Sequence, residues 1–378
     1  MIDSNHESLR VEKVESILLD VPTIRPHVLS MATMNKQSIV ILRLRFSDGT
    51  VGIGEATTIG GLSYGNESPE SIKLTLDTYL APLLTGRSFK SIGATMGHIN
   101  RNIVGNRFAK NAVETALYDA LGHRLGVPVS ELLGGRVVDR VPVLWVLASG
   151  DLISDIDEAQ QMIESGRHNI FKIKIGKKSV AEDVAHVAAI KRAIGDKGSV
   201  RVDVNQAWTR AQASAGVAML ADADIDLVEQ PLRFDDITGM HRLVEESHIT
   251  IMADESVQGP KITFDMAAAS AADCYSIKIA QSGGLTEAAK VATIATISGA
   301  AIYGGTMLES PVGTIASAHL FSTFEKMEWG TELFAPLLLT EQFINESLDY
   351  SDFSLAVPNK PGLGLSLDED KLTFFERR

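Results

Sequence analysis

The sequence predicts an α/β protein in which a (β/α)8-type, TIM-like barrel follows an N-terminal α+β capping domain. Three observations carry this prediction. Short apolar runs recur about every 25 residues beyond residue 140, helical patterns fill the gaps between them, and the first 130 residues follow a different, antiparallel pattern. We expect a capping domain at 1–133, a barrel at 134–339 and a C-terminal segment at 340–378 that packs back on the capping domain.

The first domain opens with two extended segments, VEKVESILLDV (11–21) and IVILRLRFSDGTVGIGEA (39–56). The pair Asp48-Gly49 splits the second segment and is a strong hairpin signal, so antiparallel strands are predicted. Farther on, FAKNAVETALYDALGHRLG (108–126) has helical spacing and closes at Gly126, with Pro128 just beyond.

Eight strand candidates define the second domain. They are VPVLWVL (141–147), FKIKIG (171–176), VRVDVN (200–205), DLVEQP (226–231), ITIMADES (249–256), CYSIKIAQ (274–281), AAIYGGTM (300–307) and KMEWGTEL (326–333). Between them lie helical patterns such as 179–195 and 285–299, both ending in glycine. Strand–helix alternation predicts βαβ units, and eight such units favour a closed barrel.

Charge and composition exclude several classes of partner. The 35 Lys and Arg residues face 48 Asp and Glu residues, which gives a net charge of −13. Such a chain repels phosphate backbones and anionic membrane surfaces, so we expect no nucleic acid and no membrane partner. The apolar window at 291–308 is broken by Gly304–Gly305 and predicts a helix followed by a strand.

A single cysteine, Cys274, rules out an internal disulfide and fits a reducing cytoplasm. Its spacing from Lys278 predicts a small filler of the barrel core, in preference to a reactive thiol. The N-terminus mixes charges and lacks an apolar stretch, so no signal peptide is predicted.

Charged residues stand where the predicted strands end. In barrels of this type the active site lies at the C-terminal ends of the strands. The residues in question are Lys174, Asp203, Glu229, Asp254, Lys278 and Glu332.

Three carboxylates from consecutive strands, Asp203, Glu229 and Asp254, repel one another unless a cation lies between them. Oxygen-only ligands suit Mg²⁺ or Mn²⁺ better than zinc. Asn205 lies on the same strand face as Asp203 and is expected to support the ion from behind. Read singly, the acids are also typical helix N-caps, but their regular spacing favours the metal site.

Lys172 and Lys174 alternate with apolar residues in FKIKIG, so both amines point to one face of the strand. We expect a lysine near a metal and other cations to have a lowered pKa, as proton transfer requires. A Schiff base on Lys278, as in barrel aldolases, is the rival mechanism.

The ordered motifs KIK (172–174), DVNQAW (203–208), EQP (229–231), ADES (253–256), SIKIAQSGG (276–284) and GTELF (330–334) resemble the enolase superfamily. More narrowly, the chain is similar to the muconate cycloisomerase branch, also called muconate lactonizing enzymes. This resemblance implies Asp203, Glu229 and Asp254 as ligands of one Mn²⁺ or Mg²⁺ ion per subunit. It also implies Lys174 as the proton-transferring residue, Lys278 across the site, and Lys172 and Glu332 as residues that hold the intermediate.

Two further stretches favour the cycloisomerase branch. TTIGGLSYG (57–65) resembles a capping segment in which Ile59 and Tyr64 touch substrate, and GTELFAPLLL (330–339) resembles the end of the eighth strand, including Phe334. The resemblance implies reversible lactonization of the dicarboxylate cis,cis-muconate to muconolactone through a metal-stabilised enolate, in catechol degradation. It also implies a homo-oligomer, with an octamer expected. Chloromuconate cycloisomerase, N-acylamino acid racemase and o-succinylbenzoate synthase activities stay open as alternatives.

Three assignments have competing interpretations. Glu255 either tunes a lysine or caps a helix that begins near Ser256. The segment 22–37 is a candidate closing loop over the barrel mouth. His27, within that segment, is expected to be a solvated loop histidine more than a substrate contact.

Overall fold

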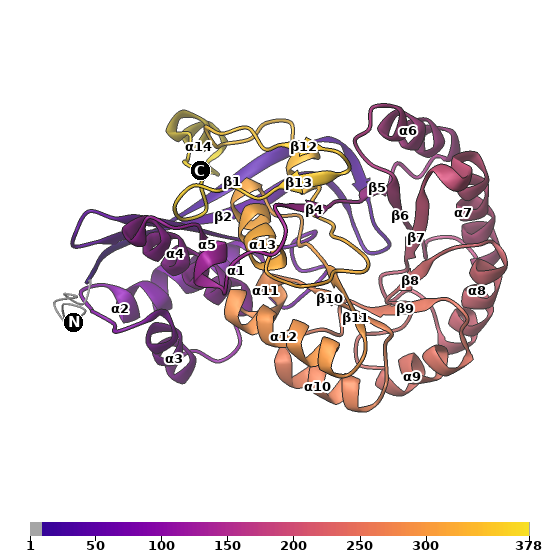
Figure 1. Ribbon diagram of the computed structural model, residues 1–378, viewed down its shortest axis with the longest axis horizontal. Coiled ribbons are helices and arrows are strands. Elements are labelled where there is room, and N and C mark those ends of the chain that lie inside the picture. Colours follow the sequence, from indigo (N-terminus) through magenta and orange to yellow (C-terminus); the bar gives the residue numbers. More distant parts are fainter. Residues whose placement is uncertain (1–9, 378) are drawn as a thin grey trace.

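The computed structural model describes residues 10–377 and shows the barrel beside a smaller domain (Figure 1). Residues 1–9, which bear most of the signal-peptide prediction, lie outside the described residues. No helix within 10–377 has the length and apolar character needed to cross a membrane. The window at 291–308 folds as predicted, with a helix that ends at Ile297 and a strand at Ala301–Gly304.

The capping domain begins with an antiparallel sheet in the order β1 (Val11–Val28), β2 (Thr33–Phe46) and β3 (Val51–Thr57), joined by the predicted hairpin around Asp48-Gly49. Its helical elements are α1 (Pro69–Thr75), a π-helical turn (Leu76–Leu80), α2 (Ala81–Leu84), α3 (Ile92–Asn102), α4 (Arg107–Leu125) and α5 (Val129–Leu132).

The prediction of a closing loop at 22–37 is wrong about its local structure. Strand β1 continues to Val28 and β2 starts at Thr33, so the segment is a long hairpin. The register of the ladder shifts between Pro22 and His27, where Pro26 has no N–H to donate. The hairpin tip reaches the barrel, since the Val28 N–H donates to the Ala148 carbonyl at 3.2 Å.

Helix α4 packs directly on β3 because the contact lacks side chains on one side. A Cβ added at Gly52 or Gly54 would lie 2.0 Å from the carbonyl oxygens of Ala116 and Ala112, respectively. Glycine on the strand and alanine every fourth residue on the helix therefore permit close backbone approach. This contact fixes the sheet against the helix that also faces the barrel.

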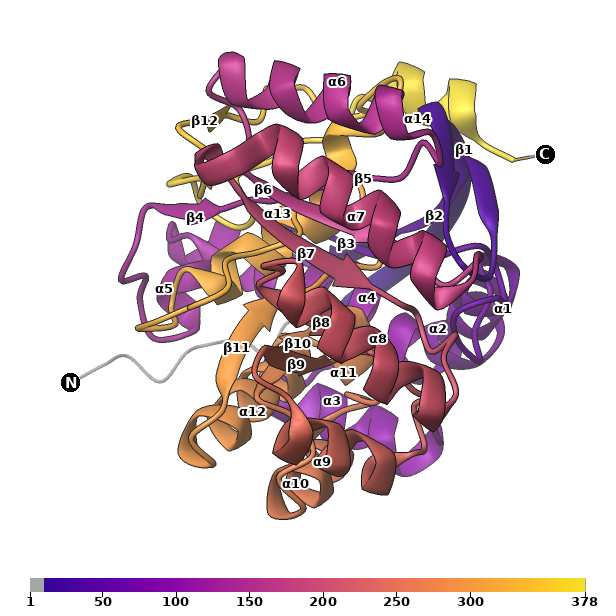
Figure 2. The same ribbon diagram turned by 90° about the vertical axis from the view of Figure 1, so that its right-hand side faces the viewer.

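The barrel sheet is parallel and runs in the order β5 (Trp145–Leu147), β6 (Ile170–Lys174), β7 (Ser199–Asp203), β8 (Leu227–Glu229), β9 (Thr250–Ala253), β10 (Cys274–Ile277) and β11 (Ala301–Gly304). Helices cover its outer face (Figure 2): α6 (Leu152–Glu164), α7 (Val180–Ile194), α8 (Arg210–Asp222), α9 (Ile237–Glu246), α10 (Pro260–Ala268) and α12 (Leu285–Ile297). Two further helices pack on the capping domain, α11 (Ile279–Ser282) against α4 and α13 (Pro311–Phe321) against β3 and α5. Short 3₁₀ turns follow at Gly195–Lys197 and Ala335–Leu337.

The eighth strand candidate closes the barrel with single bridges in place of a full ladder. Thr331 pairs in parallel with Val143 on one side and Gly304 on the other. The Leu144 N–H donates to the Thr331 carbonyl at 2.9 Å, and the Glu332 N–H donates to the Gly304 carbonyl at 2.7 Å. Glu332 is thereby held at the barrel mouth.

The C-terminal segment contacts both domains. Strands β12 (Tyr350–Ser351) and β13 (Ser354–Ala356) form an antiparallel sheet with β4 (Arg140–Pro142), which is the first half of the first strand candidate. Helix α14 (Glu369–Phe375) packs on β1, and Arg377 pairs with Asp20 of that strand. The exact division at 133 and 339 stays a prediction.

Two buried acids of the capping domain cap helices of the barrel. The Glu55 carboxylate accepts the Ser310 and Gly313 N–H groups, each at 2.7 Å, at the start of α13. Glu114 accepts the Thr286 N–H at 3.0 Å at the start of α12. Carboxylates at helix N-termini are stabilised by the unpaired N–H groups and the helix dipole. These contacts orient the capping domain on the barrel.

A pH-dependent stability follows from Glu55. Burial raises its pKa to about 7, although the Ser310 and Gly313 hydrogen bonds act in the opposite direction. Because the folded pKa exceeds the ordinary value, the folded state retains a proton that the unfolded chain releases. This contribution is complete below pH ~4.5 and is lost as pH rises to ~7. The Glu55→Gln variant lacks it, so wild type should lose free energy of unfolding relative to this variant between pH 5 and 8 in urea titrations.

A surface variant, Glu164→Gln, serves as the control and should track wild type at every pH. A difference between wild type and Glu55→Gln that stays constant across the range would contradict the assignment.

Candidate active site

Neighbouring strands bring the predicted residues together at one edge of the sheet. In the parallel ladders Lys174 lies opposite Asp203, and Asp203 lies opposite Glu229. Asp254 and Lys278 each follow directly on their strands, β9 and β10. Helices α8, α9 and α10 are capped by other residues, so none of the three acids serves as an N-cap.

Lys172 lies at the bottom of the site and is only 1% exposed. Its Nζ donates to Glu229 Oε2 at 2.8 Å and to Glu332 Oε2 at 2.6 Å, and it lies 3.9 Å from Asp203 Oδ2. A buried ammonium with two carboxylate partners avoids the large cost of an unpaired charge. Lys172 therefore links the eighth strand position to the carboxylate cluster.

The other two lysines lie on the two sides of the cluster. Lys174 Nζ pairs with Asp203, whereas Lys278 Nζ donates to Asp254 Oδ2 at 2.8 Å. Tyr64 of the capping domain joins the second pair, because its hydroxyl donates to Asp254 Oδ2 at 2.6 Å and accepts from Lys278 at 2.6 Å. The lysines thus approach the same space from opposite sides of the barrel.

Among the protein groups alone, the pKa values of Lys172 and Lys278 lie above their usual values, and the lowering expected for a lysine beside a bound metal ion stays a prediction. Burial lowers the pKa of Lys172, but the carboxylates of Glu229 and Glu332 outweigh it and hold that pKa well above its usual value. At Lys278 burial is likewise outweighed, here by Asp254, so its pKa is raised.

The pKa values of the acids reflect the excess of negative charge in the cluster. Burial and the nearby Asp203 carboxylate raise the pKa of Glu229 well above its usual value. Burial also acts to raise the pKa of Asp254, yet Lys278 outweighs it and lowers that pKa to about 2. A further cation at this point would relieve the repulsion that Glu229 experiences.

Oxygen atoms suited to such a cation are present. Glu229 Oε1, Asp254 Oδ1 and Asn205 Oδ1 are buried and accept no hydrogen bond from the protein. Their chemistry fits Mg²⁺ or Mn²⁺. Within residues 10–377 no three His, Cys, Asp or Glu side chains converge closely enough to hold a metal ion as they stand. In this arrangement each of the three acids has turned an oxygen toward a lysine.

Asn205 and Glu255 support the cluster from behind. Asn205 Nδ2 donates to Asp203 Oδ2 and to Glu255 Oε1, each at 3.1 Å. Burial, followed by the Asp254 and Asp203 charges, raises the pKa of Glu255 to about 8. Helix α10 begins at Pro260 with Gly259 as its N-cap, so Glu255 caps no helix near Ser256.

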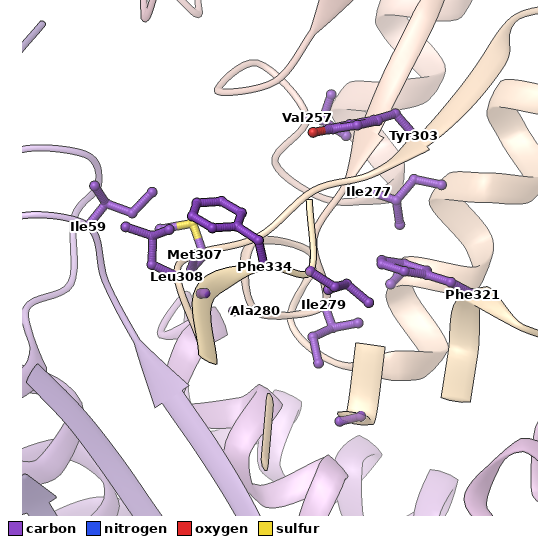
Figure 3. Packing of buried hydrophobic residues seen from close by; sticks show 14 of the residues in the cluster. Ile59, Val257, Ile277, Ile279, Ala280, Tyr303, Met307, Leu308, Phe321 and Phe334 are labelled. Atoms are coloured by element: carbon purple, nitrogen blue, oxygen red, sulfur yellow. The ribbon is translucent and has the colours of Figure 1, made fainter. Parts of the chain in front are cut away.

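The apolar side of the site comes from both domains. Figure 3 shows Ile59, from the capping domain, beside Leu308 and Met307 of the loop after β11. Ile59 and Leu308 line a small central cavity of about 10 Å³ together with the lysines and acids. Phe334 does not line this cavity; it is buried behind it, with its ring 5.3 Å from that of Trp145.

The prediction of a solvated His27 is wrong. Its side chain is 1% exposed and lines the central cavity, and burial together with the Lys174 charge holds its pKa well below the usual value. The extended hairpin β1–β2 carries it inward. Pro22 and Pro26 precede His27 and are typical of a loop, so the sequence did not indicate that the strand continues through them.

Sequence reasoning also missed Leu29, Thr306 and Leu308, which line the central cavity. Thr306 lies at the end of the seventh strand candidate and Leu308 directly after it, so the rule that strand ends face the site could have found both. Neither residue carries a charge, and the sequence prediction used only the charged residues at the strand ends.

Comparison with known proteins places these features in a family. Residues 13–134 match the model for the mandelate racemase/muconate lactonizing enzyme N-terminal domain, and residues 155–371 match the enolase C-terminal domain-like model. A muconate cycloisomerase of Acinetobacter lwoffii is 56% identical over 369 residues, which cover 98% of this chain and 96% of that protein. The chain belongs to the muconate cycloisomerase family of the enolase superfamily.

Structural comparison agrees with membership of the muconate cycloisomerase family. The crystal structure of muconate lactonizing enzyme from Pseudomonas fluorescens complexed with muconolactone matches with a TM-score of 0.97 and 53% identity. The match covers 98% of this chain and all of that one, which confirms the predicted barrel and capping domain. A chloromuconate cycloisomerase of Cupriavidus necator is more distant, at 40% identity over 98% of this chain and all of that protein.

Proposed function

We propose that this chain catalyses the reversible lactonization of cis,cis-muconate to muconolactone, as a step in catechol breakdown. The observation that carries the proposal is the pair of opposed lysines, Lys174 and Lys278, on either side of a buried ring of acids. The identity of 56% to a muconate cycloisomerase, against 40% to a chloromuconate cycloisomerase, favours the unchlorinated substrate.

Enolase-superfamily sites combine a Lys or His base with one or two Mg²⁺ ions. We assign Asp203, Glu229 and Asp254 as ligands of one Mn²⁺ or Mg²⁺ ion, and the unpaired oxygens of Glu229 and Asp254 support this assignment. When bound, such an ion acts as a Lewis acid that stabilises negative charge on a substrate carboxylate.

The residues of the chain supply the proton and the environment. One carboxylate oxygen of muconate bonds to an internal alkene carbon, and the alkene electron pair moves to the carbon next to the other carboxylate. Lys174 Nζ donates a proton to that carbon and removes it in the reverse direction. Lys278, held by Asp254 and Tyr64, places a positive charge on the opposite side of the reacting atoms.

The remaining residues hold this arrangement and exclude water. Lys172 and Glu332 fix the floor of the site, while Ile59, Tyr64 and the buried His27 form its lid. Exclusion of water strengthens every electrostatic interaction in the closed site. A cytoplasmic location and a homo-oligomer, for which an octamer is expected, complete the proposal.

The reaction is tested by ultraviolet absorbance. Protein stripped with EDTA should leave cis,cis-muconate unchanged, and addition of Mn²⁺ or Mg²⁺ should restore loss of the conjugated diene, with muconolactone as the product. Metal-dependent turnover of a chloromuconate or an N-acyl amino acid, but not of muconate, would place the substrate elsewhere in the superfamily.

The role of Lys174 is tested by Lys174→Ala. Removal of a general acid–base residue typically lowers turnover by about 10²–10⁴-fold. We expect kcat to fall by that amount, while Mn²⁺ affinity, measured by calorimetry, stays within a few-fold of wild type. Lys191→Ala on the outer helix α7 serves as the control. Turnover of Lys174→Ala close to that of wild type would refute the assignment.

A further inference from the structure

The central cavity cannot admit the substrate as it stands. Its volume is about 10 Å³, which is roughly the room for one water molecule. A six-carbon dicarboxylate must therefore reach the site through a neighbouring space while the lid opens.

A second cavity, of about 210 Å³, adjoins the central cavity. It lies between the hairpin tip (Val28, Leu29 and Ser30) and the loop from β6 to α7, and we call it the vestibule. Leu29 and Lys174 line both the vestibule and the central cavity. The side chain proposed to transfer the proton therefore forms part of the wall between them.

The outer part of the vestibule carries two adjacent lysines, Lys177 and Lys178. Both are exposed, and within residues 10–377 neither amine has a carboxylate within 4 Å. They are positive charges in a chain with a net charge of −13. Unpaired ammonium groups at the rim of a cavity attract anions.

The loop that presents these lysines is fixed by its geometry. Gly176 has φ of +102°, and a Cβ at this position would lie 2.6 Å from Ala207 Cβ. Its N–H donates to Asp183 Oδ2 at 2.8 Å. Only glycine fits this turn, so the two lysines after it are held at the rim.

The acids of the vestibule are already engaged by the protein. Asp183 binds the Gly176 N–H, and Asp155 accepts the Ser149 N–H at 3.1 Å and faces His186 Nε2 at 3.3 Å. Both acids are buried, whereas Lys177 and Lys178 are exposed. An arriving anion thus meets the lysines before it meets the acids.

We propose that the vestibule is the docking site through which a small organic dicarboxylate reaches the active site, with Lys177 and Lys178 as the residues that attract it. This inference rests on the proposed function and adds the access route and the charge selectivity of the same site. A dianion moves from the exposed lysines toward Lys174, beneath the tip of the β1–β2 hairpin.

The test compares Lys177→Gln/Lys178→Gln with the control Lys197→Gln/Lys360→Gln in the Mn²⁺-loaded enzyme. Both variants lose two positive charges, but neither Lys197 nor Lys360 lines either cavity. The Debye length shrinks from roughly 30 Å at 0.01 M salt to roughly 3 Å at 1 M. Measurements at these two salt concentrations therefore separate electrostatic attraction from a change in shape.

At low salt we expect kcat/KM for cis,cis-muconate to fall about tenfold in the vestibule variant, with kcat unchanged. For muconolactone in the reverse direction kcat/KM must fall by the same factor, because both directions share one transition state and the equilibrium constant is unchanged. At high salt the vestibule variant and the control should converge. Lys177→Arg/Lys178→Arg, which keeps both charges, should behave like wild type.

A vestibule variant with the same kcat/KM and salt dependence as the control would overturn the proposal. Absence of conversion by the wild-type enzyme is a different result and would contradict the proposed function itself.

Discussion

The structure depends on one constraint, which is that charges buried at the mouth of the barrel must be neutralised by partners. Five acids and three lysines meet there: Asp203, Glu229, Asp254, Glu255, Glu332, Lys172, Lys174 and Lys278. Lys172 joins two of the acids, and each of the other lysines takes one. The acids remain in excess, which favours a divalent cation. Parallel strands in register are what bring so many charges to one edge.

The capping domain depends on the barrel through the same kind of interaction. Glu55 and Glu114 reach from the cap to the N-termini of two barrel helices, where unpaired N–H groups receive them. Gln37 adds hydrogen bonds to the carbonyls of Met307 and Leu308, in the loop that lines the site. These contacts set the position of Ile59 and Tyr64 over the acids. The closed site is thus assembled by two domains that share buried polar contacts.

Much of this could be predicted from the sequence, because strand alternation and repeat spacing are local and regular. They predicted Lys172, Asp203 and Lys278 correctly as residues of one site. The inward position of His27 could not be predicted, since it depends on a strand that continues past Pro22 and Pro26. The balance of charges around each lysine could not be predicted from the sequence either. The pKa direction of Lys172 follows from its distances to Glu229 and Glu332, which only the folded chain defines.

The central claim is that Asp203, Glu229 and Asp254 hold a divalent ion. The most direct measurement is Mn²⁺ binding, by calorimetry and electron paramagnetic resonance, to wild type and to Asp203→Asn, Glu229→Gln and Asp254→Asn. Loss of even a supporting residue of a metal site costs about 10–100-fold in affinity, so each ligand variant should lose more than about a hundredfold. Wild type should bind one ion per subunit, and Glu164→Gln should match it. Undiminished binding by all three variants would contradict the account.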